Sequence, residues 1–415
     1  MSWLPIPSDS DFTLANIPFG VFRHPITGTG HPAIAIGEHL LDLHVFSTHG
    51  GFSQLPEMVE HLEVFKQPTL NAFAALGQKT HRAVRAYLQQ VLTADSPLAA
   101  VLQYDETLQK QVLFSQDAVE MLLPMEVGDY TDFYAGRTHA FNVGCLFRGT
   151  DNALQKNYEQ LPVGYHGRAS SVVISGTPIM RPNGQTAEGV MEKCKRLDLE
   201  LEMAAFVARG NKLGEPMSVV QARENLFGFA LMNDWSARDI QAFEYVPLGP
   251  FTSKNFGTTI SSWIVLPCAL ENFKALPLQR TSTIPVQKYL LDPEEKSVYD
   301  IALTVEINGA TLTKTSSKNL LWSFPQMLAH HTVTGCNMRT GDLLGSGTIS
   351  GEGVGEAGCL LEATKGGKEP VALGGVQRTW LQDGDEVVIK GFCGEGETRV
   401  GWGECKGVIL PALDI

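Results

Sequence analysis

The chain contains 415 residues, of which 43% are hydrophobic and 19% are charged. This length and balance allow a folded protein of two or three domains and exclude a disordered chain. The formal net charge of −13 argues against nucleic acid as the main partner, because phosphate binding requires a basic surface. No stretch of the sequence approaches the roughly 18 apolar residues of a membrane span, so we expect no contact with a membrane.

The cysteines and the N-terminal residues predict a cytoplasmic protein. The seven cysteines form no C-x-x-C pair, which argues against a disulfide scaffold or a thiolate zinc site and favours reduced thiols. Residues 1–12 carry neither the basic nor the apolar segment of a secretory signal peptide.

The first hundred or so residues are predicted to form a separate module. Gly37 and Glu38 suit the turn of a hairpin, and apolar residues at helical spacing follow from Pro68 onward. The expected strands are 20–22, 33–36 and 39–43, and the expected helices are 68–92 and 105–114. We expect this module to serve packing or dimer support in preference to catalysis.

From about Leu123 glycine becomes frequent and short strands predominate. A strand is expected over 302–307, followed by Asn308-Gly309, which is a strong signal for a tight hairpin turn. Helices are few, and two of them are expected to begin at Ser218 and Ser323, since each serine has a glutamine three residues later. The pattern predicts a β-rich sandwich or roll.

An acidic strand is the most informative stretch of the chain. Over residues 197–202, leucine at the odd positions alternates with Asp198, Glu200 and Glu202, which predicts a β-strand with one apolar and one acidic face. A solvated strand face is the simplest interpretation of these carboxylates. If the acidic face lines a pocket instead, its charges require protons or a cation, because buried like charges repel one another.

Two further acidic residues extend this alternative. Asp132 lies in a short run of acidic and aromatic residues, and Asp234 follows an apolar run, where the N-cap of a helix is the competing interpretation. Together with Glu200 and Glu202 they would form an all-oxygen site. Such ligands favour Mg²⁺ or Ca²⁺ over zinc, although E-x-E pairs and single aspartates are also common where no metal binds.

A general base is the second candidate feature. His139 qualifies, because histidine exchanges a proton near neutral pH, although a lone histidine is more often structural. His330 and His331 are adjacent on a predicted helix and point in different directions, so we interpret them as packing or capping residues. The glycine-rich stretches 249–259 and 345–351 suit either an anion or simple turns. Neither a P-loop nor a G-x-S-x-G motif occurs.

Six stretches carry a resemblance to a known family. They are 128–134, 161–171, 197–203, 232–241, 245–251 and 346–351, and they include the runs G-D-Y-T-D-F-Y and L-P-V-G-Y-H-G-R-A-S-S. On these motifs the chain closely resembles the fumarylacetoacetase family over nearly its whole length. Smaller relatives in the same superfamily share the E-x-E and the later Asp, but usually lack the N-terminal module and the T-D-F-Y run.

The resemblance implies a fold, an assembly and a reaction. The implied fold is mainly β with few helices, with an SH3-like barrel over residues 1–118 and a mixed β-roll that carries the catalytic site over residues 119–415. The protein would be a homodimer that hydrolyses a carbon–carbon bond of 4-fumarylacetoacetate. The products would be fumarate and acetoacetate, in the last step of tyrosine and phenylalanine breakdown.

The resemblance also implies a Ca²⁺ or Mg²⁺ cofactor. The matching ligand positions are Asp132, Glu200, Glu202 and Asp234, and a further cation position matches Asp234, Lys254 and Thr258. Because an ammonium cannot ligate a cation, we expect Lys254 to contribute its backbone carbonyl. Asp198 matches no role in the motif and is expected to lie outside the coordination shell.

The remaining site residues follow from the same match. His139 matches the general base and Glu362 its orienting partner. The positions around the leaving carbanion are Arg238, Gln241 and Lys254, and the substrate-binding positions are Tyr134, Arg148, Gln241, Tyr245 and Thr348.

Two other interpretations stay open on the sequence alone. An acylpyruvate hydrolase, an enol-diacid isomerase or an oxaloacetate decarboxylase of the same superfamily would use similar carboxylates, but the N-terminal module and the stretches around Tyr134 and Tyr245 argue against them. A non-enzymatic β module stabilised by a metal would explain the acidic strand. It would not explain why a base, an arginine and a lysine accompany that strand.

Overall fold

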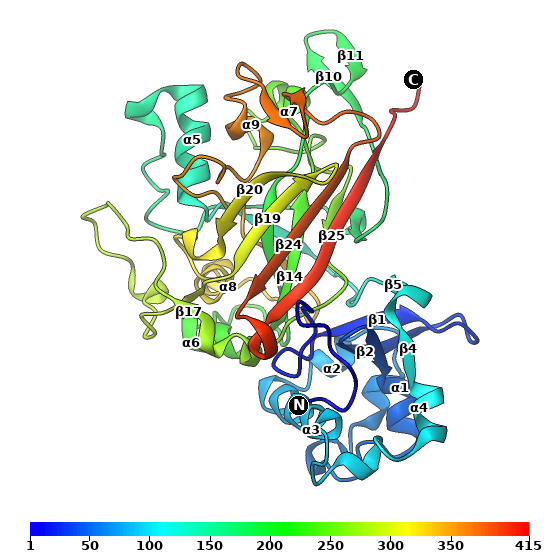
Figure 1. The fold of residues 1–415 in the computed structure, drawn as a ribbon. Coiled ribbons are helices and arrows are strands. Elements are labelled where there is room, and N and C mark those ends of the chain that lie inside the picture. The colour runs from blue at the N-terminus through cyan, green and yellow to red at the C-terminus, as the bar shows by residue number, and fades with distance from the viewer. Residues whose placement is uncertain (415) are drawn as a thin grey trace.

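Strands dominate the computed structural model, which describes residues 1–414 (Figure 1). Nine α-helices lie among the described residues, and most of them are short. The expectation of a mainly β fold with few helices is therefore confirmed. No helix of the described chain is long and apolar enough to cross a membrane.

The N-terminal part is built on a five-stranded antiparallel sheet of order β4-β3-β2-β1-β5. The predicted turn at Gly37 and Glu38 is confirmed, since Ile36 of β2 pairs with His39 of β3. The strands are β1 (Phe19–Arg23), β2 (Gly30–Ile36), β3 (His39–Asp42), β4 (Leu113–Ser115) and β5 (Glu120–Leu122), and the helices are α1 (Leu43–Thr48), α2 (Asn71–Ala74), α3 (Gln78–Leu92) and α4 (Glu106–Val112).

The single helix predicted over 68–92 is wrong, because this stretch forms α2 and α3. Gly77 lies between them with φ +85° and ψ 167°, a backbone conformation that is essentially restricted to glycine. The apolar stripe is preserved in α3, which buries Val84, Leu88 and Val91. The second predicted helix is confirmed as α4, and the Asp105 side chain caps it by accepting from the backbone N–H of Leu108 at 2.9 Å.

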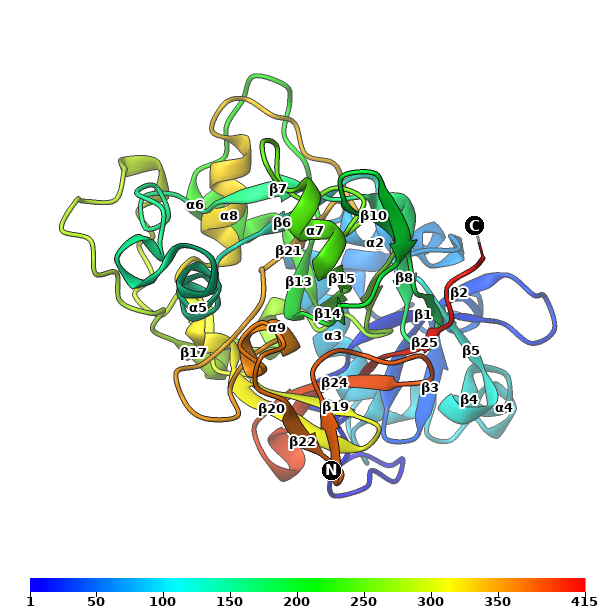
Figure 2. The same cartoon turned by 90° about the horizontal axis from the view of Figure 1, so that it is seen from above.

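Two larger sheets form the rest of the molecule (Figures 1 and 2). The seven-stranded sheet has the order β7-β6-β21-β13-β14-β16-β8, with β6 (Tyr130–Phe133), β7 (Gly164–His166), β8 (Val172–Ile174), β13 (Leu201–Val207), β14 (Leu226–Asp234), β16 (Thr258–Ile260) and β21 (Leu343–Gly345). The five-stranded sheet has the order β20-β19-β24-β25-β9, with β9 (Ile179–Met180), β19 (Ala302–Ile307), β20 (Ala310–Ser316), β24 (Glu386–Cys393) and β25 (Val400–Leu410).

Short elements complete the C-terminal part. The helices are α5 (Arg137–Arg148), α6 (Val219–Glu224), α7 (Arg238–Glu244), α8 (Phe324–Thr332) and α9 (Leu360–Ala363). Two-stranded pairs are β10 (Asn183–Ala187) with β11 (Val190–Lys193), β12 (Leu197–Asp198) with β15 (Ser236–Ala237), β17 (Lys274–Ala275) with β18 (Val298–Tyr299), and β22 (Val371–Leu373) with β23 (Val376–Arg378).

Local signals in this part are confirmed. The β19–β20 hairpin turns at Asn308 and Gly309, which both adopt positive φ (51° and 75°). Ser218 and Ser323 begin α6 and α8 in capping boxes, as their spacing from Gln predicted.

The seven-stranded sheet is buried on both faces. Met203 and Ala205 of β13 pack into a core that includes Leu303 of the five-stranded sheet, whereas Ala204 and Phe206 pack on the opposite face into a core that includes residues of the N-terminal part. Strand residues two apart share a face, so Glu202 lies on the same face as Ala204 and Phe206. The N-terminal part therefore covers one face of the seven-stranded sheet, and the acidic residues lie at one end of that same face.

The solvated interpretation of the acidic strand is wrong. Asp198 and Glu202 have 0% exposed surface and Glu200 has 5%. The strand is also interrupted, since β12 ends at Asp198 and β13 begins at Leu201. The carboxylates therefore require compensation inside the protein, which is the condition for a functional site.

Candidate active site

A cavity of about 570 Å³ opens at the end of the seven-stranded sheet where the acidic strand begins. Helices α5, α7 and α9 lie around the ends of β6 and β13 there (Figure 2). Most of the expected site residues line this cavity: Asp132, Tyr134, His139, Arg148, Glu200, Glu202, Arg238, Gln241, Tyr245, Lys254 and Thr348. Asp234, Thr258 and Glu362 lie behind its wall, where the first two are paired across β14 and β16 and Glu362 contacts His139.

Three buried carboxylates converge at the wall of the cavity, where two of them line the cavity and the third lies behind it. Asp132, Glu202 and Asp234 each offer an oxygen within 4.8 Å of the other two. One oxygen of each (Asp132 Oδ1, Glu202 Oε1 and Asp234 Oδ1) is buried without a hydrogen-bond partner among the described residues. The second oxygen of Glu202 accepts from the backbone N–H of Gly347 at 2.9 Å, and that of Asp234 accepts from the Tyr165 hydroxyl at 3.1 Å.

This arrangement fits a hard divalent cation. Burial, reinforced by the neighbouring carboxylates, raises the pKa of Asp132 and Glu202 well above the usual range, so without a cation the protonated forms of these groups are favoured. A cation that replaced those protons would satisfy the three orphaned oxygens at once. Gly345 keeps the space clear, because a Cβ at this position would lie 2.6 Å from Asp132 Oδ1.

Glu200 differs from the other three carboxylates of the expected ligand set. Its Oε1 accepts from Arg238 Nη2 at 2.7 Å, and its Oε2 contacts the Lys254 ammonium. Although burial opposes it, these two cations hold the pKa of Glu200 well below its usual range. The structure therefore groups Glu200 with the cationic side chains, while Asp132, Glu202 and Asp234 form the convergent cluster.

Lys254 is the second buried cation of the site. Its ammonium contacts Glu200 Oε2 and Asp234 Oδ2. Burial lowers the pKa of Lys254, but Asp234 and Glu200 outweigh burial and raise it above the usual value. At the end of β14, Asp234 therefore contacts Lys254 and also belongs to the carboxylate cluster. The interpretation of Asp234 as a helix N-cap is wrong, because Ala237 is the N-cap of α7.

His139 and Glu362 form a buried dyad. His139 Nδ1 lies 2.5 Å from Glu362 Oε2, whose carboxylate also accepts from Asn142 Nδ2 at 2.9 Å and Ser350 Oγ at 2.8 Å. This contact assigns the proton to Nδ1 and leaves the Nε2 lone pair available. His139 lines the cavity, with Nε2 3.6 Å from Glu200 Oε1. The geometry is that of a general base held in one tautomer by a carboxylate.

The expected substrate-binding side chains surround the dyad at different depths. The Tyr134 ring meets the His139 ring edge-on at 5.5 Å, and Gln241 Oε1 accepts from Arg238 Nη1 at 3.0 Å. Tyr245 lies near the surface with 44% exposure. The Arg148 guanidinium donates to the backbone carbonyls of Asn152 and Ala153 while the residue lines the cavity.

The structure adds residues that sequence reasoning missed. Arg196, Lys365, Lys368 and Trp380 also line the cavity. No local motif marks them, because they come from loops that only the fold brings to this wall. Asn142, Ser350 and Cys359, which donate to Glu362, were likewise missed. His330 Nδ1 lies 2.9 Å from the Tyr289 hydroxyl and His331 Nε2 lies 2.8 Å from Thr131 Oγ1, so both side chains have local hydrogen-bond partners.

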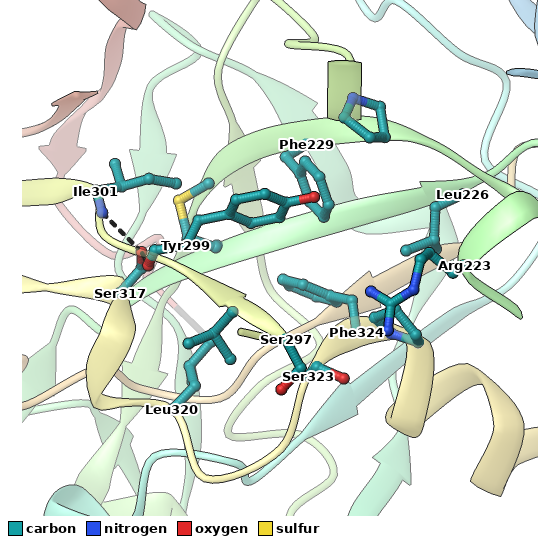
Figure 3. A pocket seen from close by; sticks show the side chains of 14 residues that line it. Arg223, Leu226, Phe229, Ser297, Tyr299, Ile301, Ser317, Leu320, Ser323 and Phe324 are labelled. Atoms are coloured by element: carbon teal, nitrogen blue, oxygen red, sulfur yellow. Dashed lines mark hydrogen bonds between the residues drawn. The ribbon is translucent and has the colours of Figure 1, made fainter. Parts of the chain in front are cut away.

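A second, much smaller cavity lies against the opposite side of β13 and β14 (Figure 3). Phe229, Tyr299 and Phe324 surround it, and the Ile301 N–H donates to Ser317 Oγ at 3.2 Å beside it. Its volume of about 30 Å³ is far below the roughly 300–1,000 Å³ of ligand pockets. It is therefore too small for a substrate site.

Comparison with known proteins identifies the family. A family model described as "Fumarylacetoacetate (FAA) hydrolase C-terminal" matches residues 130–406, and one described as "Fumarylacetoacetase N-terminal" matches residues 15–124. The chain belongs to the fumarylacetoacetase family. It is 55% identical to a fumarylacetoacetase of Aspergillus fumigatus (100% of this chain, 99% of that protein) and 47% identical to the fumarylacetoacetase of Homo sapiens (100% and 99%).

Solved structures show that the fold extends beyond the close fumarylacetoacetase relatives. A fumarylacetoacetate hydrolase from Exiguobacterium antarcticum matches with a TM-score of 0.54 at 17% identity, covering 95% of this chain and 99% of that one. A putative HpcE protein from Mycobacterium smegmatis matches with a TM-score of 0.54 at 16% identity, covering 95% and 99%. At these identities the comparison shows a shared fold and nothing further.

The carboxylate cluster predicts an unusual dependence of stability on pH when no cation is present. The raised pKa of Glu202 means that above about pH 5 the folded chain holds a proton that the unfolded chain releases. The stabilisation that this proton gives the folded chain is complete below the pKa of Glu202 in the unfolded chain. It is lost as pH rises toward the pKa of Glu202 in the folded chain, by at most about 1.4 kcal/mol per pH unit. Glu202→Gln cannot titrate, so in EDTA its stability relative to the wild type should increase from pH 5 to pH 8.

Urea unfolding at several pH values measures this difference. Glu244→Gln is the matched control: hydrogen bonds from Ser253 and Thr252 lower the pKa of Glu244 against the effect of burial, so this group is ionised in both states over that range. Parallel pH profiles for Glu202→Gln and the wild type would contradict the assignment.

Proposed function

We propose that this chain hydrolyses the carbon–carbon bond of 4-fumarylacetoacetate to give fumarate and acetoacetate, the last step of tyrosine and phenylalanine breakdown. The observation that carries the proposal is the His139–Glu362 dyad, which faces the same cavity as the carboxylate cluster and two buried cations. Full-length identities of 44–55% to proteins named fumarylacetoacetase favour this substrate over those of the smaller superfamily members.

The residues fit the chemistry of this hydrolysis. Water must attack the ketone beside the fumaryl group, and the proposed base is His139 Nε2, which takes a proton from that water while Glu362 holds Nδ1–H. The bond between this carbon and the acetoacetate methylene then breaks, and the electron pair passes to the acetoacetate fragment as an enolate. That fragment takes a proton at carbon, so water is consumed and no oxidant is required.

The leaving enolate needs positive charge in a site with little water. Arg238 and Lys254 are buried and remain charged, and Gln241 adds an amide beside the guanidinium, so we assign these three side chains to the developing charge. Tyr134, Arg148, Tyr245 and Thr348 are the proposed substrate contacts. A dianionic substrate also suits the lysines and arginines of the cavity wall.

Ca²⁺ or Mg²⁺ is the proposed cofactor. Asp132, Glu202 and Asp234 would hold it, and Glu200 stays in the proposed set although both its oxygens contact cationic side chains. When bound, the cation supplies Lewis-acid stabilisation of the diketone oxygens. We keep Thr258 and the backbone carbonyl of Lys254 as ligands of a proposed further cation position beside Asp234.

The domain organisation and assembly belong to the same proposal. We propose that the N-terminal sheet is an SH3-like barrel and that the remainder is the catalytic β-roll. The boundary was expected after residue 118, but β5 (Glu120–Leu122) pairs with β1, so we place the division after Leu122. A cytoplasmic homodimer is proposed as well, and exposed Val246, Leu248 and Phe251 near the cavity offer apolar surface to a second copy.

Turnover of the substrate tests the proposed function directly. Purified protein loaded with Mg²⁺ or Ca²⁺ should consume 4-fumarylacetoacetate, and the loss of the substrate's ultraviolet absorbance measures this consumption. EDTA should abolish the reaction until the cation is restored. An acylpyruvate and an oxaloacetate control in the same assay separate the superfamily alternatives. Absence of turnover by the cation-loaded protein would overturn the proposal.

His139→Ala should lower kcat by roughly 10²–10⁴-fold, because it removes the proposed base. Binding of Mg²⁺ or Ca²⁺, measured by calorimetry, should be retained, since His139 is not in the carboxylate cluster. The control is His49→Ala, which changes an exposed histidine at the end of α1. Near-normal turnover of His139→Ala would exclude it as the base.

The cationic wall of the cavity should assist binding of an anionic substrate. Arg196 is exposed and lines the cavity of a protein whose net charge is −13. Arg196→Gln should lower kcat/KM by about two- to fivefold, the range of a solvent-screened charge contact, and should weaken the salt dependence of kcat/KM. Arg82→Gln, remote from the cavity, is the control, and an unchanged salt dependence in Arg196→Gln would remove this residue from substrate binding.

A further inference from the structure

We propose that Asp198 is a positioning residue that holds Arg238 and the helix carrying Glu362 in one fixed arrangement. Asp198 is not among the residues that line the cavity, and its side chain is fully buried. The contacts of Asp198 are observed in the structure, and only their consequence for turnover rests on the proposed function.

Four N–H groups converge on the Asp198 carboxylate. Oδ1 accepts from the backbone of Leu360 at 2.7 Å and of Leu199 at 2.9 Å. Oδ2 accepts from the backbone of Leu361 at 3.0 Å and from Arg238 Nε at 2.9 Å. A carboxylate has about four acceptor positions, so this side chain is saturated and has no capacity left for a cation or a substrate.

The first consequence concerns the guanidinium of Arg238. Asp198 holds Nε, Glu200 holds Nη2 at 2.7 Å, and Gln241 holds Nη1 at 3.0 Å. Because the guanidinium is planar and rigid, three contacts at its three nitrogens determine both its position and its plane. One N–H on each terminal nitrogen is left over, and Arg238 lines the cavity in which the leaving enolate must be stabilised.

The second consequence concerns helix α9. This helix starts after Cys359, whose side chain makes no capping bond, so its first N–H groups need acceptors from elsewhere. Asp198 supplies them to Leu360 and Leu361, immediately before Glu362. A shift of this first turn would displace Glu362 and, through the 2.5 Å contact, the ring of His139.

Only a carboxylate satisfies all four donors. An asparagine presents one acceptor oxygen and one NH₂ group. The NH₂ would point either at the two backbone N–H groups that donate to Oδ1 or at the N–H groups of Leu361 and Arg238 that donate to Oδ2. Asp198→Asn keeps the size and shape of the side chain but forces one of these neighbours to move. The proposed base and the proposed enolate stabiliser would then lose their common anchor.

The test compares Asp198→Asn with Asp385→Asn. Asp385 is also buried, and it also accepts from a backbone N–H (Gln382, 2.7 Å) and an arginine (Arg378, 3.3 Å), but it lies outside the cavity. Both variants should lose thermal stability. Only Asp198→Asn should also lose kcat, by about 10–100-fold per folded molecule, with KM little changed and with calorimetric Mg²⁺ affinity retained.

A crystal structure of Asp198→Asn supplies a readout that needs no substrate, and it should show Arg238 or the first turn of α9 displaced. If Asp198→Asn does not accumulate as folded protein, Asp198→Ser, which keeps one short acceptor, takes its place. Retention of kcat within twofold, or an equal loss of kcat in Asp385→Asn, would overturn the inference. Failure of the wild type to turn over 4-fumarylacetoacetate would overturn the proposed function instead, while the crystal structure would still test the anchor.

Discussion

The burial of six carboxylates beside two cationic side chains is the constraint on which this molecule depends. Asp132, Asp198, Glu200, Glu202, Asp234 and Glu362 are each at most 9% exposed, and Arg238 and Lys254 are the buried cations that contact members of this group. Charge removed from water requires a partner or a proton. The structure divides the six accordingly. Asp198 and Glu200 pair with Arg238 and Lys254, and Glu362 accepts a hydrogen bond from His139 Nδ1. Asp132, Glu202 and Asp234 each keep one oxygen without a partner among the described residues, while the other oxygen of Asp234 contacts Lys254.

This division gives each group its chemical role. The paired carboxylates hold Arg238 and Lys254 in place, so their positive charge is available in the cavity without reorganisation. The orphaned oxygens of Asp132, Glu202 and Asp234 create the demand for a divalent cation. In the proposed reaction, such a site would stabilise a leaving carbanion, because its charges are already oriented and are poorly screened.

The seven-stranded sheet makes such burial possible, because both of its faces are covered. The N-terminal part packs against one face through the core that includes Phe73 and Phe206, and the five-stranded sheet covers the other. Glu202 and Asp234, at this end of β13 and β14, are accordingly almost fully buried, with 0% and 1% exposed surface. Among the described residues, the lining of the large cavity comes entirely from the C-terminal part, and the packing or dimer-support role of the N-terminal part stays a prediction.

The sequence by itself determined several local elements and predicted the candidate site residues. The alternation at 302–307, the Asn308-Gly309 turn and the capping boxes at Ser218 and Ser323 depend on neighbouring residues, so their predictions held. The helix over 68–92 failed at Gly77, because the conformation of one glycine is set by what surrounds it. Only the tertiary structure decided that the acidic strand is buried, that Glu200 joins the cations and that Asp198 anchors α9. Charge compensation depends on contacts between residues as far apart in sequence as Asp198 and Leu361, and no local pattern records such contacts.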